Sequence, residues 1–126
     1  MVGLVVVSHS RTAAEGIAEV AAEMGGETVI EPVGGDGQGG LGTVADDIAD
    51  AIEAADDGDG VVVLVDLGSA VMNAEVAIEL SGVDAVIADA PVLEGAVNAA
   101  VAATSPSATV DSVREQAEAA RDVDKR

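Results

Sequence analysis

The stretch VVVLVDLGS at residues 61–69 places five apolar residues directly before a polar turn. A short apolar run rich in β-branched side chains is typical of a strand buried on both faces, as in a parallel sheet. Three further runs of this kind lie at residues 2–7, 28–33 and 85–88, and each is bounded by turn signals. The chain is therefore expected to form four strands of one sheet.

Segments with helical spacing separate and follow these runs. The expected helices cover residues 12–24, 43–55, 69–80, 91–103 and a last segment from Thr109 or Asp111 to Arg121. The first is expected to close on Gly25-Gly26 as a C-cap. The order β-α-β-α-β-α-β-α-α predicts a doubly wound α/β fold, with a four-stranded parallel sheet of order 2-1-3-4 and helices on both faces. A single domain over residues 1–126 is expected.

The composition excludes several classes of function. A net charge of −19 opposes binding to DNA, RNA or an anionic membrane, and the absence of aromatic residues removes stacking platforms for single strands. Without cysteine there is no disulfide or thiolate, and one histidine cannot build a multi-histidine metal site. We therefore expect no metal and no cofactor. Because no apolar run is long enough to cross a bilayer and no export signal opens the chain, a cytoplasmic protein is expected.

The few cations are unevenly placed. Four of the five lie within residues 114–126, which leaves Arg11 as the only cation among the first 113 residues. An acidic surface of this kind suggests adaptation to high salt, because the Debye length falls to about 3 Å at 1 M and repulsion is screened. A halophilic habitat is a hypothesis that follows from this excess of carboxylates.

Ligands of doubly wound sheets bind beyond the carboxyl ends of the strands, where the strand order reverses. In the order 2-1-3-4 this point lies between the first and third strands, so His9 and Asp66 are predicted neighbours. A carboxylate that holds one imidazole nitrogen fixes the tautomer and leaves the other nitrogen as a nucleophile or base. Ser10 and Ser69 stand at expected helix starts, where free N–H groups favour a phosphate or carboxylate.

A glycine-rich tract at residues 34–42 follows the second strand and can fold over the same crevice. Backbone N–H groups at glycines approach anions closely, and Arg11 is the nearby cation that we expect to steer a phosphoryl group. The tract is not a dinucleotide fingerprint, which would follow the first strand. A receiver domain is also disfavoured, because its Mg²⁺ site needs an acidic pair where this chain has Ser8-His9-Ser10.

Four segments together resemble the phosphotransfer subunits of dihydroxyacetone kinases, a family related to mannose-type enzyme IIA domains of the phosphotransferase system. They are residues 5–10 (VVVSHS), 40–43 (GLGT), 66–73 (DLGSAVMN) and 91–96 (PVLEGA). The resemblance implies a homodimer of α/β fold that takes a phosphoryl group from an HPr-like phosphocarrier. It also implies transfer to ADP on a nucleotide-binding subunit, whose ATP then phosphorylates dihydroxyacetone on a substrate-binding subunit.

The resemblance also implies the roles of individual residues. His9 would carry the phosphoryl group on Nε2, and Asp66 would orient the ring. A phosphate pocket would include Ser10 and Ser69 together with loop positions matching Gly39, Gly40, Gly42 and Thr43. Two alternatives stay open: a mannose-type sugar-transport carrier with the same chemistry, and an anion- or nucleotide-binding module without turnover.

Overall fold

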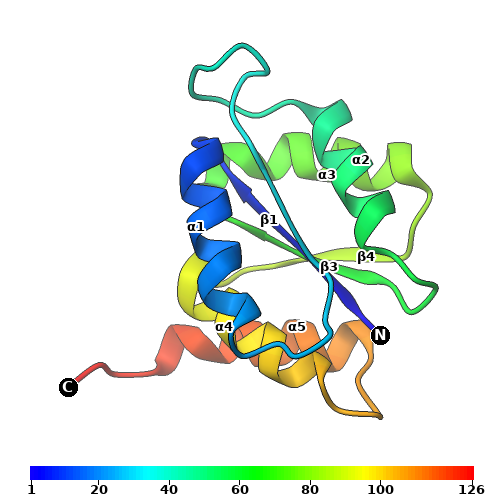
Figure 1. The fold of residues 1–126 in the computed structure, drawn as a ribbon, viewed down its shortest axis with the longest axis vertical. Helices are drawn as coiled ribbons and strands as arrows, with labels where there is room; N and C mark the ends of the chain where they lie inside the picture. Colours follow the sequence, from blue (N-terminus) through cyan, green and yellow to red (C-terminus); the bar gives the residue numbers. More distant parts are fainter.

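Four parallel strands form the centre of the computed structural model, which describes residues 1–126 (Figure 1). They are β1 (Gly3–Ser8), β2 (Ile30–Gly34), β3 (Val61–Val65) and β4 (Ala85–Ala88). All neighbouring strands pair in parallel, in the order β2-β1-β3-β4, so the predicted topology is confirmed. β2 begins two residues later than expected because the Thr28 N–H donates to the Gly25 carbonyl in the turn before it.

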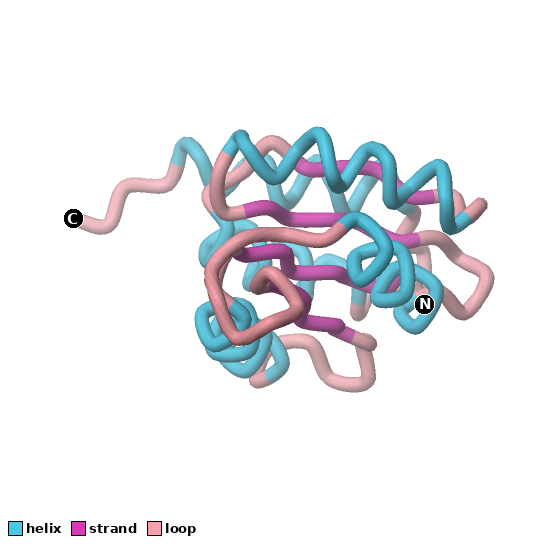
Figure 2. Tube along the Cα trace, turned by 90° about the horizontal axis from the view of Figure 1, so that it is seen from above, coloured by secondary structure: helices cyan, strands magenta, loops and turns pink.

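Helices cover both faces of this sheet (Figure 2). They are α1 (Arg11–Ala22), α2 (Ala45–Ala55), α3 (Val71–Ser81), α4 (Val92–Ala103) and α5 (Val110–Ala119), with single 3-10 turns at Gly68–Ala70 and Ala120–Asp122. Side chains alternate across each strand, so Leu4 and Val6 pack against α1, α4 and α5 while Val5 and Val7 pack against α2 and α3. The predicted doubly wound arrangement is therefore present.

The end of α1 differs from the sequence prediction. α1 ends at Ala22 with Glu23 as its C-cap, so the prediction of a Gly25-Gly26 cap is wrong. The N–H groups of Glu23, Met24 and Gly25 each donate to the carbonyl three residues earlier, which tightens the last turn and ends the helix early. α5 begins as expected, because Thr109 caps it in a reciprocal pair of hydrogen bonds with Ser112.

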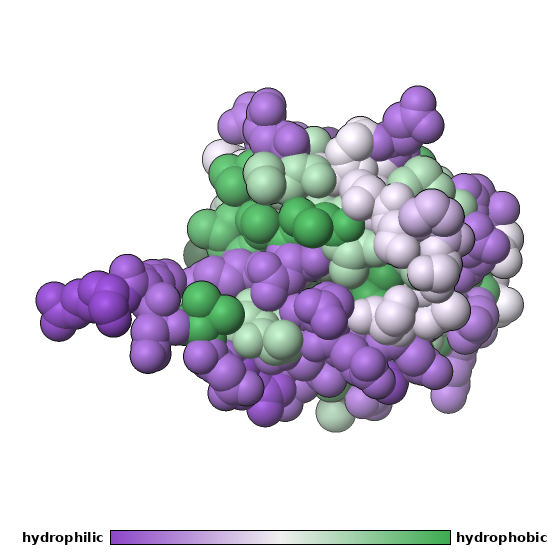
Figure 3. All heavy atoms as spheres, turned by 90° about the horizontal axis from the view of Figure 1, so that it is seen from below, coloured by the Kyte–Doolittle hydropathy of each residue, from purple (hydrophilic) through white to green (hydrophobic).

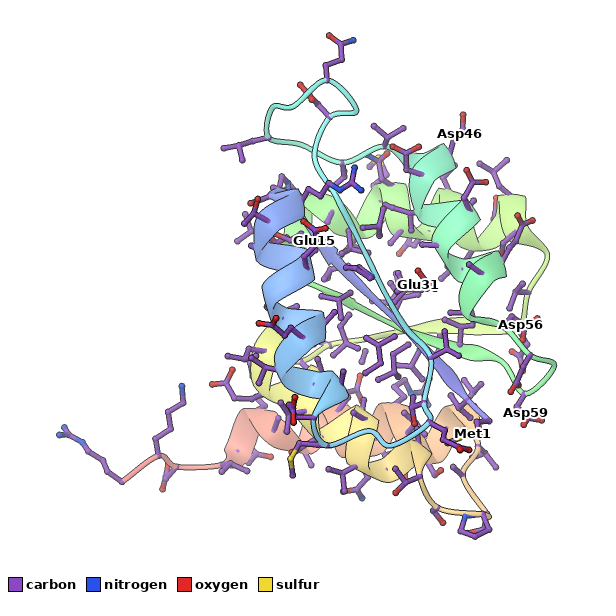
Figure 4. The ribbon with its side chains drawn as sticks, in the orientation of Figure 1. Met1, Glu15, Glu31, Asp46, Asp56 and Asp59 are labelled. Carbon is purple, nitrogen blue, oxygen red and sulfur yellow. The ribbon has the colours of Figure 1, made fainter.

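The first residues of the chain are held against the loop that precedes β3. The Met1 ammonium donates to Asp57 Oδ2 at 2.7 Å and to Asp59 Oδ2 at 2.6 Å, and Figure 4 shows Met1 beside this loop. Val2 is buried in the core. At the other end, the chain after Asp122 leaves the body (Figure 1), but Val123 still lines a groove beside α1 and α4, and Lys125 Nζ lies 2.7 Å from Glu94 Oε2. None of the helices is long and apolar enough to cross a membrane.

Candidate functional site

His9 and Asp66 meet at the carboxyl edge of the sheet, at the reversal of strand order. His9 follows the end of β1 and Asp66 follows the end of β3, and these two strands are neighbours. His9 Nδ1 lies 3.0 Å from Asp66 Oδ1, and the two side chains are 26% and 19% exposed. The expected pair is therefore formed, partly buried but open to solvent. No three His, Cys, Asp or Glu side chains are arranged to hold a metal ion.

The second oxygen of Asp66 is bound by two donors from the end of β1. Asp66 Oδ2 accepts from the Ser8 hydroxyl at 2.9 Å and from the His9 backbone N–H at 3.0 Å. Burial raises the pKa of the Asp66 carboxyl, but hydrogen bonds from the His9 backbone, the His9 ring and Ser8 outweigh it and lower the pKa below its ordinary value. The carboxylate is therefore ionised at neutral pH and can only accept.

The ionised carboxylate determines the tautomer of His9. Since Asp66 Oδ1 can only accept, Nδ1 carries the hydrogen and donates to it. In the neutral ring Nε2 then keeps its lone pair, and it accepts from the Ser69 hydroxyl, whose oxygen lies 2.9 Å away. The arrangement presents an unprotonated nitrogen toward solvent, with a hydroxyl beside it that can rotate toward an incoming group.

Ser69 does not cap α3, contrary to its expected place at the start of a helix. It lies in the 3-10 turn Gly68–Ala70, and the helix starts at Val71 without a side-chain cap. This turn brings the Ser69 hydroxyl to the His9 ring. Ser10 does cap its helix, because its hydroxyl accepts from the Ala13 N–H. Its own N–H donates to Ser8 Oγ at 3.1 Å.

The outer half of the glycine-rich loop closes on the Asp36 side chain. Asp36 Oδ1 accepts from the N–H groups of Gln38 and Gly40 at 2.8 and 2.9 Å. The positive φ angles of Gly37 and Gly39, 83° and 87°, permit this tight path. The Gly40 N–H expected to face a phosphate is thus bonded within the loop, while Gly39 lies at its exposed outer end.

The inner half of the loop lies against His9. The Gly42 N–H donates to the His9 carbonyl at 2.9 Å, so this group is also bonded within the protein. Thr43 Oγ1 accepts from the Asn73 side chain at 2.8 Å, which ties the loop to α3. The structure thus places Gly42 and Thr43 beside the histidine and its neighbouring helix, and Gly39 and Gly40 farther along the loop.

Two polar residues of the site had no role in the sequence prediction. Ser8 and Asn73 both fall within the motifs quoted above, but their partners depend on the positions of two separate loops. The one feature of the sequence that could have indicated a role for Ser8 is a hydroxyl at the end of a buried strand. Ser8 is 2% exposed. Nothing in the chain order alone pairs Asn73 with Thr43.

The surface around His9 and Asp66 carries exposed apolar side chains and one cation. Leu41, Leu67 and Met72 are 77%, 57% and 74% exposed. Arg11 lines a hollow of about 330 Å³ between the start of α1 and the glycine-rich loop. Its guanidinium is exposed, and its one ion pair is a 4.0 Å contact with Glu15. Arg11 is therefore available to an anion that approaches this edge of the sheet.

The chain is similar to proteins of known family along most of its length. Residues 3–114 match the family model described as PTS system fructose IIA component. The chain is 43% identical to PEP-dependent dihydroxyacetone kinase 2, phosphoryl donor subunit DhaM, of Listeria innocua, a match that covers 80% of this chain and 85% of the relative. It is 34% identical to PTS-dependent dihydroxyacetone kinase, phosphotransferase subunit DhaM, of Lactococcus lactis, with 92% and 93% covered.

A longer relative and a solved structure are also similar to this chain along most of its length. A match to the phosphoryl donor subunit DhaM of Providencia stuartii, at 36% identity, covers 95% of this chain and 27% of that protein. The crystal structure of EF1359, a protein of unknown function, superposes with a TM-score of 0.79 at 31% identity and covers 94% of both chains.

Proposed function

This chain belongs to the family of PTS system fructose IIA components, as a DhaM-type phosphoryl donor subunit of a PEP-dependent dihydroxyacetone kinase, and we propose that it carries the phosphoryl group on His9. The observation that carries the proposal is the contact chain Asp66 Oδ1, His9 Nδ1, His9 Nε2 and Ser69 Oγ, with 3.0 Å and 2.9 Å at its two hydrogen bonds. It leaves Nε2 unprotonated and accessible.

In the first step, the Nε2 lone pair attacks the phosphorus of the donor's phosphohistidine. A P–N bond forms at His9 as the donor's P–N bond breaks, and the electron pair of that bond returns to the donor imidazole. The Asp66 carboxylate stabilises the positive charge that develops on the ring, because Nδ1 keeps its hydrogen and donates to Oδ1. Ser69 Oγ turns from Nε2 toward a phosphoryl oxygen.

In the second step, a β-phosphate oxygen of ADP on the nucleotide-binding subunit attacks the same phosphorus. The new P–O bond forms as the bond to Nε2 breaks, and His9 returns to its starting tautomer. Such in-line transfer depends mainly on positioning and on exclusion of water, so no metal is required on this chain. We propose that Ser10, Ser69, Gly42 and Thr43 lie around the phosphate, and that Gly39 and Gly40, which line the hollow beside Arg11, form its outer wall.

The proposed partners are an HPr-like phosphocarrier as donor, and the nucleotide-binding and substrate-binding kinase subunits. What supports protein partners at this edge is the set of exposed apolar side chains at Leu41, Leu67 and Met72. The body is strongly acidic, so these contacts must supply much of the attraction. Arg11 adds the one positive charge close to the incoming phosphoryl group.

A homodimer is also proposed. Apolar side chains gather on the face turned away from the glycine-rich loop (Figure 3). On the side of α1 and α4, Val20, Leu93, Val97 and Val123 line a groove of about 290 Å³. An apolar surface apart from His9 suits contact between two copies that both remain open to their partners. Light scattering behind size exclusion gives the mass, and a monomer at micromolar concentration would oppose the dimer.

The phosphocarrier proposal is tested by incubation with phosphorylated HPr and measurement of intact mass. Wild type is expected to gain one phosphoryl group that is labile in acid and stable in base, and His9→Ala is expected to gain none. Circular dichroism checks that the variant is folded. Labelled protein is then mixed with the ADP-loaded kinase subunit, since formation of ATP separates this function from sugar transport. Absence of labelling of wild type by a competent donor would contradict the proposal.

A further inference from the structure

Ser8 is a buried polar side chain next to the reacting histidine. It is the last residue of β1 and is 2% exposed, whereas most buried residues are apolar. Burying a hydroxyl is unfavourable unless its hydrogen bonds are made. Ser8 makes two, and both connect to parts of the site.

The direction of each bond follows from its partners. The Ser10 backbone N–H can only donate, so Ser8 Oγ accepts from it at 3.1 Å. The Ser8 hydrogen is then free for Asp66 Oδ2, which as part of an ionised carboxylate can only accept, at 2.9 Å. The hydroxyl therefore connects the first residue before α1 to the residue after β3, and its orientation is determined.

These contacts restrict the rotation of the carboxylate. Asp66 Oδ2 is bound by the Ser8 hydroxyl and the His9 backbone, both at the end of β1, so Oδ1 is left to face the His9 ring. Resting on the function proposed above, we propose that Ser8 is a positioning residue for phosphoryl transfer: its buried hydroxyl holds Asp66 so that Oδ1 accepts from His9 Nδ1. Ser8 itself does not touch the phosphoryl group.

Because His9 is the only histidine, the ring nitrogens of the protein give one set of signals in ¹H–¹⁵N spectra. In wild type these signals are expected to report hydrogen on Nδ1. In Ser8→Ala a second population with hydrogen on Nε2 is expected, because the carboxylate is no longer held from one side. Thr28→Val is the matched control, since it removes a buried hydroxyl whose oxygen has no partner, and it is expected to leave the tautomer unchanged.

Kinetics supply a second readout. With phosphorylated HPr as donor, Ser8→Ala is expected to lower the maximal rate of labelling in a single turnover about tenfold, because a hydrogen bond to a charged group is lost. The donor concentration that gives half of this rate stays unchanged, because the docking surface is intact. Ser8→Thr keeps the hydroxyl and is expected to recover the rate and the tautomer. A folded Ser8→Ala with the wild-type tautomer and rate would overturn the proposal.

The two proposals fail in different ways. If HPr does not phosphorylate wild type, the phosphocarrier function is wrong, while the ring spectra still decide the role of Ser8. If wild type is phosphorylated and Ser8→Ala behaves like it in both readouts, the function stands and the positioning role is wrong.

Discussion

Replacing Asp66 by asparagine should reverse the tautomer of His9. The side-chain oxygen of asparagine must take the place of Oδ2, because the His9 backbone N–H and the Ser8 hydroxyl both donate there. The amide NH₂ group then takes the place of Oδ1 and donates toward Nδ1. Nδ1 must accept, so the ring hydrogen moves to Nε2, and the nitrogen that attacks phosphorus loses its lone pair.

The size of the effect follows from the cost of the opposite orientation. With NH₂ at the Oδ2 position, the Ser8 hydroxyl could turn to accept, but the His9 backbone N–H could not. One unsatisfied buried donor costs about 1–3 kcal/mol, which corresponds to roughly a 5- to 150-fold preference for the unreactive tautomer. Loss of the negative charge that stabilises the phosphorylated ring adds to this. Asp66→Asn should therefore accept a phosphoryl group at least about fivefold more slowly than wild type.

The assay is the rate of labelling by phosphorylated HPr, combined with ring ¹H–¹⁵N spectra of the single histidine. Asp89→Asn is the matched control, because Asp89 follows the neighbouring strand β4 and its exposed carboxylate does not contact His9. It should label at the wild-type rate. Wild-type labelling by Asp66→Asn, with hydrogen still on Nδ1, would refute the reasoning.

Further predictions concern packing, charge, pH and salt. A Cβ on Gly34 would lie 2.2 Å from a backbone oxygen of β1, so Gly34→Ala should lower the free energy of unfolding by about 1–3 kcal/mol, measured in urea. Gly16 in α1 has open space around it, so Gly16→Ala should raise the free energy of unfolding by about 1 kcal/mol. Equal changes in this free energy for Gly34→Ala and Gly16→Ala would contradict the packing argument. Arg11→Ala should slow labelling by phosphorylated HPr several-fold at low salt and little at high salt, whereas Arg114→Ala on α5 removes the same charge without this effect. Identical rates for both variants would remove the steering role. Because folding lowers the pKa of Asp66, its stabilising contribution is present above about pH 4 and is lost as the pH falls through the folded-state pKa. The free energy of unfolding should therefore fall less steeply with decreasing pH in Asp66→Asn than in wild type. Parallel pH curves for the two proteins would contradict this. If the acidic surface is a salt adaptation, the thermal midpoint should rise between low and molar KCl; an unchanged midpoint would contradict it.

The architecture was accessible from the sequence because its signals are strong and local. Apolar β-branched runs gave β3 and β4 with their observed bounds, and strand order followed from the handedness of crossovers. The meeting of His9 and Asp66 followed from that order alone, since both residues stand directly after neighbouring strands.

The finer contacts depend on geometry that spacing does not encode. Gly40 lies in a glycine-rich loop whose composition is typical of anion-binding loops. Its backbone N–H instead donates to the Asp36 side chain. Ser69 reads as a helix cap, yet a 3-10 turn before α3 carries its hydroxyl to His9 instead. In each case a short polar side chain has several hydrogen-bond partners within reach. The partner it binds depends on where a turn or helix begins, and a difference of one or two residues changes it.

The two halves of the glycine-rich loop are held by separate hydrogen bonds, so a segment can be inserted between them without breaking either set. Asp36 closes the outer half, while Gly42 and Thr43 hold the inner half to His9 and α3. Between them, a Cβ on Gly37 or Gly39 would meet no atom within 4 Å. Each doubling of loop length costs only about 0.6 kcal/mol in closure entropy. A peptide tag or fluorophore-binding insert between Gln38 and Gly39 would thus lie at the outer edge of the hollow that Arg11 lines, and could report the docking of each partner in turn.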